Sequence, residues 1–149
     1  MELLPNKETK SKGLLLWIII IGISAYIILA LIIQYVFSDE VHSLSRYFVS
    51  GFPYRKLLTI KTIMRLLILV SFVGIIYNIK ESIFGIWIAY IILTLISIIS
   101  IFGIKKEINT SLKIISVVFN LSTLLIPAVI TFLINPIKSS FKRILPSPK

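Results

Sequence analysis

Five side chains in the last apolar run of the chain, residues 114–134, are the first candidates for chemistry. The run holds no ionisable residue, and its small or polar positions recur at spacings of 4, 3, 4 and 4. On an α-helix such spacings place residues on one face, and Ile, Val, Leu and Phe cover the remainder. Because lipid solvates only the apolar side, we expect this stripe to face protein or a wet cavity. The polar stripe consists of Ser116, Asn120, Thr123, Pro127 and Thr131.

The polar stripe has two interpretations. In the first it packs helices together, because hydroxyls and amides join helices in lipid through hydrogen bonds worth about 0.6 kcal/mol each. Pro127 would then add a kink that frees the carbonyl near Thr123. In the second, the stripe lines a path for a small polar solute. The sequence favours packing, because no Asp, Glu, Lys, Arg or His stands in the middle of a predicted span, and coupled carriers usually need such a group.

His42 is the only histidine, and it ends the string Asp-Glu-Val-His at 39–42. Metal ions need three or four converging ligands and no second cluster supplies them, so we predict no metal and no cofactor. A nucleophile–base pair of His42 with Ser43 or Ser45 is rejected, because no nucleophile elbow accompanies them. The chain lacks cysteine, which excludes thiol chemistry. A membrane-surface enzyme is kept as a third hypothesis, with Asp39, His42 and Arg46 of the first loop as its residues.

Composition identifies the elements that must position these residues. Apolar residues make up 57% of the 149, and the mean hydropathy is +1.00, whereas soluble domains have about 45–50% apolar residues. Four long apolar runs predict an all-α polytopic membrane protein, one domain over residues 1–149 formed by a bundle of four transmembrane helices. The first run is too long for a signal peptide and is read as a retained span. The predicted spans are about 14–37, 59–79, 83–104 and 114–134.

The second predicted span has the shortest apolar core. Its charge-free part, residues 66–79, is short for a bilayer, and Lys61 and Arg65 stand four residues apart just before it. Long basic side chains can extend to the head groups. We therefore expect the span to begin near Thr59.

Two amphipathic segments accompany the spans. The first loop, residues 38–58, is expected to hold a short interfacial helix with Ser38 as its N-cap. The tail after Ile134 is basic and amphipathic, and its prolines should confine any helix to its middle. We expect this tail to rest on anionic lipid head groups. The candidate head-group contacts are Lys138, Lys142 and Arg143.

The net charge of +10 bears on partners and orientation. Basic residues are scattered between the spans, which favours lipid head groups and argues against nucleic acid. Eight Lys and Arg fall on each side of four spans, so the positive-inside rule is tied. The basic residues nearest the first span precede it, and we therefore expect both termini in the cytoplasm. Frequent isoleucine and an excess of lysine over arginine suggest the cell membrane of a low-GC bacterium.

Small or polar seams on every span, little soluble mass and no buried charge favour an interaction protein. It would be a regulator, an assembly partner or an immunity-type protector that binds another membrane protein, or itself, within the bilayer. The alternative is a subunit of an oligomeric channel or carrier lined by the polar stripe. Neither reading assigns a catalytic residue. The seam of the first span, spaced at intervals of four, is Gly22, Tyr26, Ala30 and Gln34.

Overall fold

The computed structural model describes residues 7–105 and 110–144, with side chains described for 10–105 and 110–135. The described residues form helices joined by short turns and contain no strand. Four helical segments are long and apolar enough to cross a membrane, which confirms the prediction of an all-helical chain with four candidate spans. These segments are Lys10–Val36, Tyr54–Ile76, Glu81–Phe102 and Thr110–Asn135.

Helices α3 (Tyr54–Ile76) and α4 (Glu81–Phe102) form an antiparallel hairpin through a tight turn. The helix α3 ends three residues before the predicted limit, because Asn78 has a left-handed φ of 57°. The N–H of Ile79 bonds the carbonyl of Gly74 at 2.9 Å, and the N–H of Asn78 bonds that of Ile75 at 3.0 Å. This pair of bonds is the Schellman pattern that ends many helices.

The two helices of the hairpin approach each other closely at glycines. A β-carbon on Gly74 would collide with the side chain of Ser82, and one on Gly85 would collide with the hydroxyl of Ser71. Apolar side chains of both helices are buried next to these glycine contacts, namely Ile68 and Phe72 of α3 and Ile86 and Ala89 of α4. Small residues at a crossing allow helix backbones to pack at short range where no water drives association.

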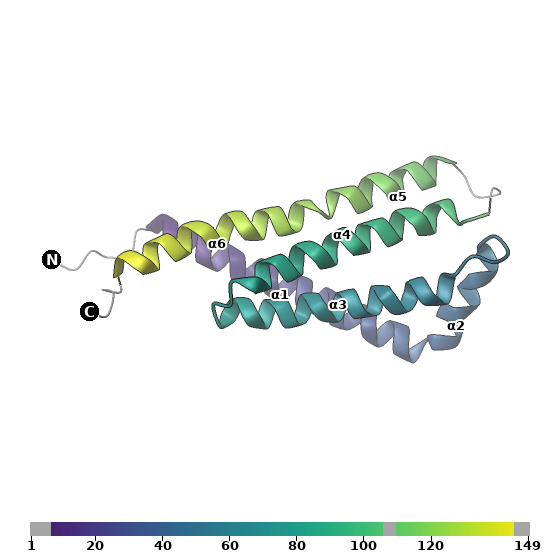
Figure 1. Cartoon of the computed structure of the whole chain (residues 1–149), viewed down its shortest axis with the longest axis horizontal. Coiled ribbons are helices and arrows are strands. Elements are labelled where there is room, and N and C mark those ends of the chain that lie inside the picture. Colours follow the sequence, from purple (N-terminus) through teal and green to yellow (C-terminus); the bar gives the residue numbers. More distant parts are fainter. Residues whose placement is uncertain (1–6, 106–109, 145–149) are drawn as a thin grey trace.

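The helix α1 (Lys7–Val36) lies behind this hairpin and packs against α6 (Leu125–Ile144) and α3. Figure 1 shows that α1 begins, and α6 ends, at the same end of the molecule as the turn between α3 and α4. Apolar side chains from α1 and α6 join one continuous core with those of α3 and α4. The α1 and α6 members of this core are Leu16, Ile20, Ile27, Ile130, Leu133 and Ile134.

The fourth candidate span consists of two helices, α5 (Thr110–Ser122) and α6, separated at Thr123 and Leu124. Pro127 has no N–H to offer the carbonyl of Thr123, four residues earlier. The N–H of Ile126 bonds that carbonyl instead, at 3.1 Å. The interruption expected from Pro127 is therefore present. Beyond it, α6 continues through Pro136 to Ile144, so the prediction that the prolines confine any helix to the middle of the tail was wrong at Pro136. A fixed φ near −65° is compatible with helical backbone.

The first loop contains two short pieces, α2 (Ser38–Ser43) and the 3₁₀ helix η1 (Leu44–Tyr47), rather than one interfacial helix. The N-cap is Phe37 and no side chain caps it, so the prediction of Ser38 as N-cap was wrong. Beyond η1, the loop docks on the end of α4: the N–H of Val49 bonds the carbonyl of Gly103 at 3.0 Å. The rings of Phe48 and Phe52 stack there with centroids 4.8 Å apart.

Candidate functional site

The polar stripe runs along α5 and α6 on the side that meets α4. Ser116 and Asn120 lie on α5, Thr123 lies at the interruption, and Thr131 lies on α6, all four half-buried. Pro127 is fully buried. None of the five residues predicted to share a face is therefore fully exposed, and only Pro127 is fully buried.

Two hydrogen bonds connect the polar stripe to α4. The indole Nε1–H of Trp87 donates to the hydroxyl of Thr131 at 3.0 Å, and the hydroxyl of Thr94 donates to the carbonyl of Asn120 at 3.4 Å. Trp87 and Thr94 stand seven residues apart on α4, about two helical turns, so they share one face, which is the small or polar seam of the third span. The seams of the third and fourth spans thus face each other.

The remaining polar groups of the stripe bond within their own helical segments. The side-chain amide of Asn120 donates to the carbonyl of Ser116 at 2.7 Å. The hydroxyl of Thr131 donates to the carbonyl of Pro127 at 2.7 Å. The hydroxyl of Thr123 donates to the carbonyl of Asn120 at 2.6 Å. Within the described part of the chain, no fully buried side-chain nitrogen or oxygen lacks a hydrogen-bond partner.

The predicted head-group contacts lie at the other end of α6. Lys138, Lys142 and Arg143 belong to its last turns, and their side chains lie outside the described residues. Figure 1 places this end of α6 beside the start of α1. The side chain of Lys12 on α1 lies over the ring of Phe132 at 5.9 Å.

A second polar cluster joins α1 to α3, and the sequence analysis did not anticipate it. The side-chain amide of Gln34 donates to the hydroxyl of Thr62 at 2.8 Å, and Arg65 donates from Nη1 to the Gln34 oxygen at 3.4 Å. Thr62 donates in turn to the carbonyl of Leu58 at 3.0 Å. Lys61, one turn before Arg65, is also half-buried.

Arg65 stands at the centre of α3, eleven residues from Tyr54 and eleven from Ile76. The expectation that no ionisable residue occupies the middle of a span is therefore wrong for this helix. Arg65 is central only along α3: its partner Gln34 stands two residues before the α1 span ends at Val36, so the guanidinium lies near that end of α1. A hydrogen bond to a charged group is worth about 1.5–3 kcal/mol. The signal in the sequence was Pro53, since proline commonly precedes or opens a helix and would have moved the start of the span back to Tyr54.

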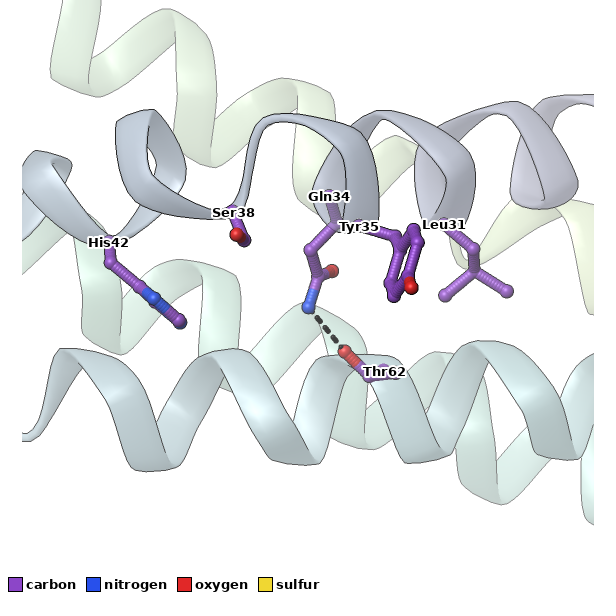
Figure 2. A pocket seen from close by; sticks show the side chains of 6 residues that line it. All are labelled: Leu31, Gln34, Tyr35, Ser38, His42 and Thr62. Carbon is purple, nitrogen blue, oxygen red and sulfur yellow. Dashed lines mark hydrogen bonds between the residues drawn. The ribbon is translucent and has the colours of Figure 1, made fainter.

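A crevice of about 340 Å³ opens beside this cluster, between the end of α1, α2 and α3. Figure 2 shows the side chains of α1 and α2 that line it directed towards α3, with the Gln34–Thr62 hydrogen bond crossing the gap. His42 is one of the lining residues, whereas Arg46 lies against the ring of Tyr47 at 5.3 Å. The full lining is Leu31, Gln34, Tyr35, Ser38, His42 and Thr62.

The first loop does not assemble the groups of the enzyme hypothesis into a pocket. Asp39 and Glu40 are exposed and do not line the crevice that holds His42. The hydroxyl of Ser43 donates to the carbonyl of Glu40 at 2.7 Å. Among the described residues, no three side chains of His, Asp or Glu gather closely enough to hold a metal ion.

The outer face of α1, defined here as Gly22, Tyr26 and Leu29, is uncovered. Tyr26 is 66% exposed and makes no hydrogen bond within the described part, and a β-carbon on Gly22 would meet nothing within 4 Å. Gln34, three steps of four residues beyond Gly22, faces α3 instead. Each step of four residues turns the helix by about 40° beyond a full turn, so the predicted seam of α1 divides between two faces.

The four candidate membrane-spanning helices indicate a multi-pass membrane protein. Comparison with protein-family models, with curated proteins and with solved structures finds no match for the chain.

Proposed function

We propose that this chain is a small integral membrane protein that acts by binding another membrane protein through the outer face of α1. The observation that carries the proposal is the contrast between this face and the other seams. Polar groups of α4, α5 and α6 bond one another, as Trp87 and Thr131 do, whereas a β-carbon on Gly22 would meet nothing within 4 Å and Tyr26 is 66% exposed. A regulator, an assembly partner or an immunity-type protector would use such a face.

The chemistry of this face suits a helix as partner. A glycine without neighbours lets a second backbone approach closely, and small residues are enriched at helix interfaces in lipid. Tyr26 lies well inside the candidate span Lys10–Val36, where water is absent and its hydroxyl gains from a protein acceptor. Surrounding Ile and Leu need no such partner, because lipid solvates them.

In this proposal the four candidate spans form one bundle in the cell membrane of a bacterium, with both termini in the cytoplasm. The helix bounds support that orientation. With α3 beginning at Tyr54, Lys61 and Arg65 belong to a span rather than a loop. The Lys and Arg count was tied at eight to eight. When every Lys and Arg inside the four candidate spans is left out, six remain on the side of the termini against three opposite, and the positive-inside rule then favours cytoplasmic termini.

Site-specific photocrosslinking in the native membrane tests the proposal. A photoreactive residue at Tyr26 or Leu29 should give a discrete crosslinked species, and Gly22→Phe should abolish it by blocking the close approach. Matched controls are Val70 on α3 and Phe132 on α6, both 67% exposed, which should crosslink only to lipid. A single crosslinked band at twice the mass of the chain would identify a second copy of the chain as the partner. Lipid adducts alone at all four positions would contradict the proposal.

A further inference from the structure

The crevice between α1, α2 and α3 has the character of a ligand site rather than of a packing gap. Five of its six lining residues carry hydrogen-bonding side chains. Ser38, Tyr35 and His42 form no hydrogen bond through their side chains in the described part of the chain. Figure 2 shows Leu31 and Tyr35 towards one end of the crevice and Ser38 and His42 towards the other. The crevice therefore offers the free polar groups of Ser38 and His42 at one end, and Leu31 with the free hydroxyl of Tyr35 at the other.

The charge beside this crevice has no counter-ion among the described side chains. One guanidinium N–H of Arg65 donates to the side-chain oxygen of Gln34, which is a neutral acceptor. Lys61 lies one turn away on the same face of α3. No carboxylate pairs with either cation within the described residues. All six Asp and Glu of the sequence stand outside the four candidate spans or, as Glu81 does, at the first residue of one.

We propose that this crevice binds a phosphate-class anion, either the head group of an anionic phospholipid or free inorganic phosphate, with Arg65 as its charge partner. The planar guanidinium fork matches two phosphate oxygens, and the free hydroxyls of Ser38 and Tyr35 can donate to the others. Arg65 does not itself line the crevice, but it donates to Gln34, which does, and Gln34 thereby acts as a positioning residue for the guanidinium. Leu31 supplies an apolar wall next to which an acyl chain can lie.

A lipid is the source that the position of the crevice favours. The lining extends from the last turns of α1 into α2, across the end of the candidate span at Val36. Phospholipid phosphates lie at that boundary of the hydrocarbon core. The inference does not depend on the outer face of α1, because none of its three residues lines the crevice.

The test uses the full chain in two parallel measurements. In nanodiscs with equal phosphatidylglycerol and phosphatidylcholine, native mass spectrometry counts the lipids that stay bound after release. In neutral detergent, thermal unfolding is followed with inorganic phosphate against chloride at equal ionic strength. The variants are Arg65→Gln, Arg65→Lys, which keeps the charge, and Arg55→Gln as the matched control from the exposed start of α3.

The proposal expects one retained phosphatidylglycerol, or a thermal shift with phosphate, that Arg65→Gln weakens by about tenfold or more. Arg65→Lys should retain part of the effect, and Arg55→Gln all of it. Retention of the lipid without a phosphate shift identifies the phospholipid as the source, and the reverse identifies free phosphate. If Arg65→Gln fails to fold, the surface pair Ser38→Ala and His42→Ala should weaken binding instead. Equal retention of both lipids without a phosphate shift, or equal losses for Arg55→Gln and Arg65→Gln, would overturn the proposal.

Discussion

The fourth and first candidate spans both carry small or polar residues at helical spacing, yet only one of them is closed within the chain. On the fourth span, Thr131 and Asn120 receive hydrogen bonds from Trp87 and Thr94 of α4. On the first span, the outer face of α1 is largely exposed, and no hydrogen bond joins it to another described helix. Spacing identifies a face in both cases. Whether that face is covered depends on a neighbouring helix with matching groups, and α4 supplies them only for α5 and α6.

Replacing Gly74 should give the largest change in stability. Gly74→Val places a β-carbon against Ser82 and forces α3 and α4 apart, which should lower the free energy of unfolding by about 1–3 kcal/mol. Unfolding in mixed micelles of sodium dodecyl sulfate measures the change. Gly22→Val is the matched control, since its side chain enters open space. Equal losses for the two variants would show that α3 and α4 are not closely packed.

The Trp87–Thr131 contact should account for a smaller part of the stability. A double-mutant cycle with Trp87→Phe and Thr131→Val should give a coupling energy of about 0.6 kcal/mol, the mean for hydrogen bonds between membrane helices. The same micelle unfolding supplies the four free energies. Trp17→Phe, at a half-exposed indole, should show no coupling to Thr131→Val. A coupling energy of zero for Trp87 and Thr131 would show that their hydrogen bond does not stabilise the packing of α4 against α6.

Single cysteines distinguish a closed stripe from a water-filled path without lowering stability much. The chain has no cysteine, so Ser116→Cys, Thr123→Cys and Thr131→Cys can each be labelled against no background. We expect little reaction with a water-soluble maleimide, because all three positions are half-buried and the stripe is bonded to α4 at Asn120 and Thr131. Ser45→Cys in the exposed first loop should react readily. Fast labelling at all three stripe positions would instead support the channel or carrier alternative.

The smallest effect on stability is expected on the open face. Tyr26→Leu should change the free energy of unfolding by less than about 0.5 kcal/mol, because two thirds of the side chain is exposed and leucine keeps much of the remaining apolar contact. In the Tyr26→Leu variant, the yield of the crosslinked species obtained with a photoreactive residue in place of Leu29 should nevertheless fall. A large loss of stability, measured by micelle unfolding, would mean that the ring already packs within the chain.

Sequence reasoning recovered the number and approximate bounds of the candidate spans, and it anticipated the interruption near Pro127. It missed the start of α3 because charged residues were read as a boundary, although Pro53 marks the first turn. It treated the first loop as one helix, whereas the loop pairs with Gly103, a residue far along the chain. A pairing between such distant segments leaves no periodic signal in either one.

The sequence by itself determined that this chain is helical and that four of its segments can cross a membrane, because length and hydropathy are local properties of each run. Only the tertiary structure decided which polar residues meet. Gln34 and Arg65 are 31 residues apart, and their hydrogen bond depends on which helix α3 lies beside and at what rotation. The same choice of neighbours left Gly22 and Tyr26 exposed, since a helix can turn only part of its circumference towards the helices that pack on it.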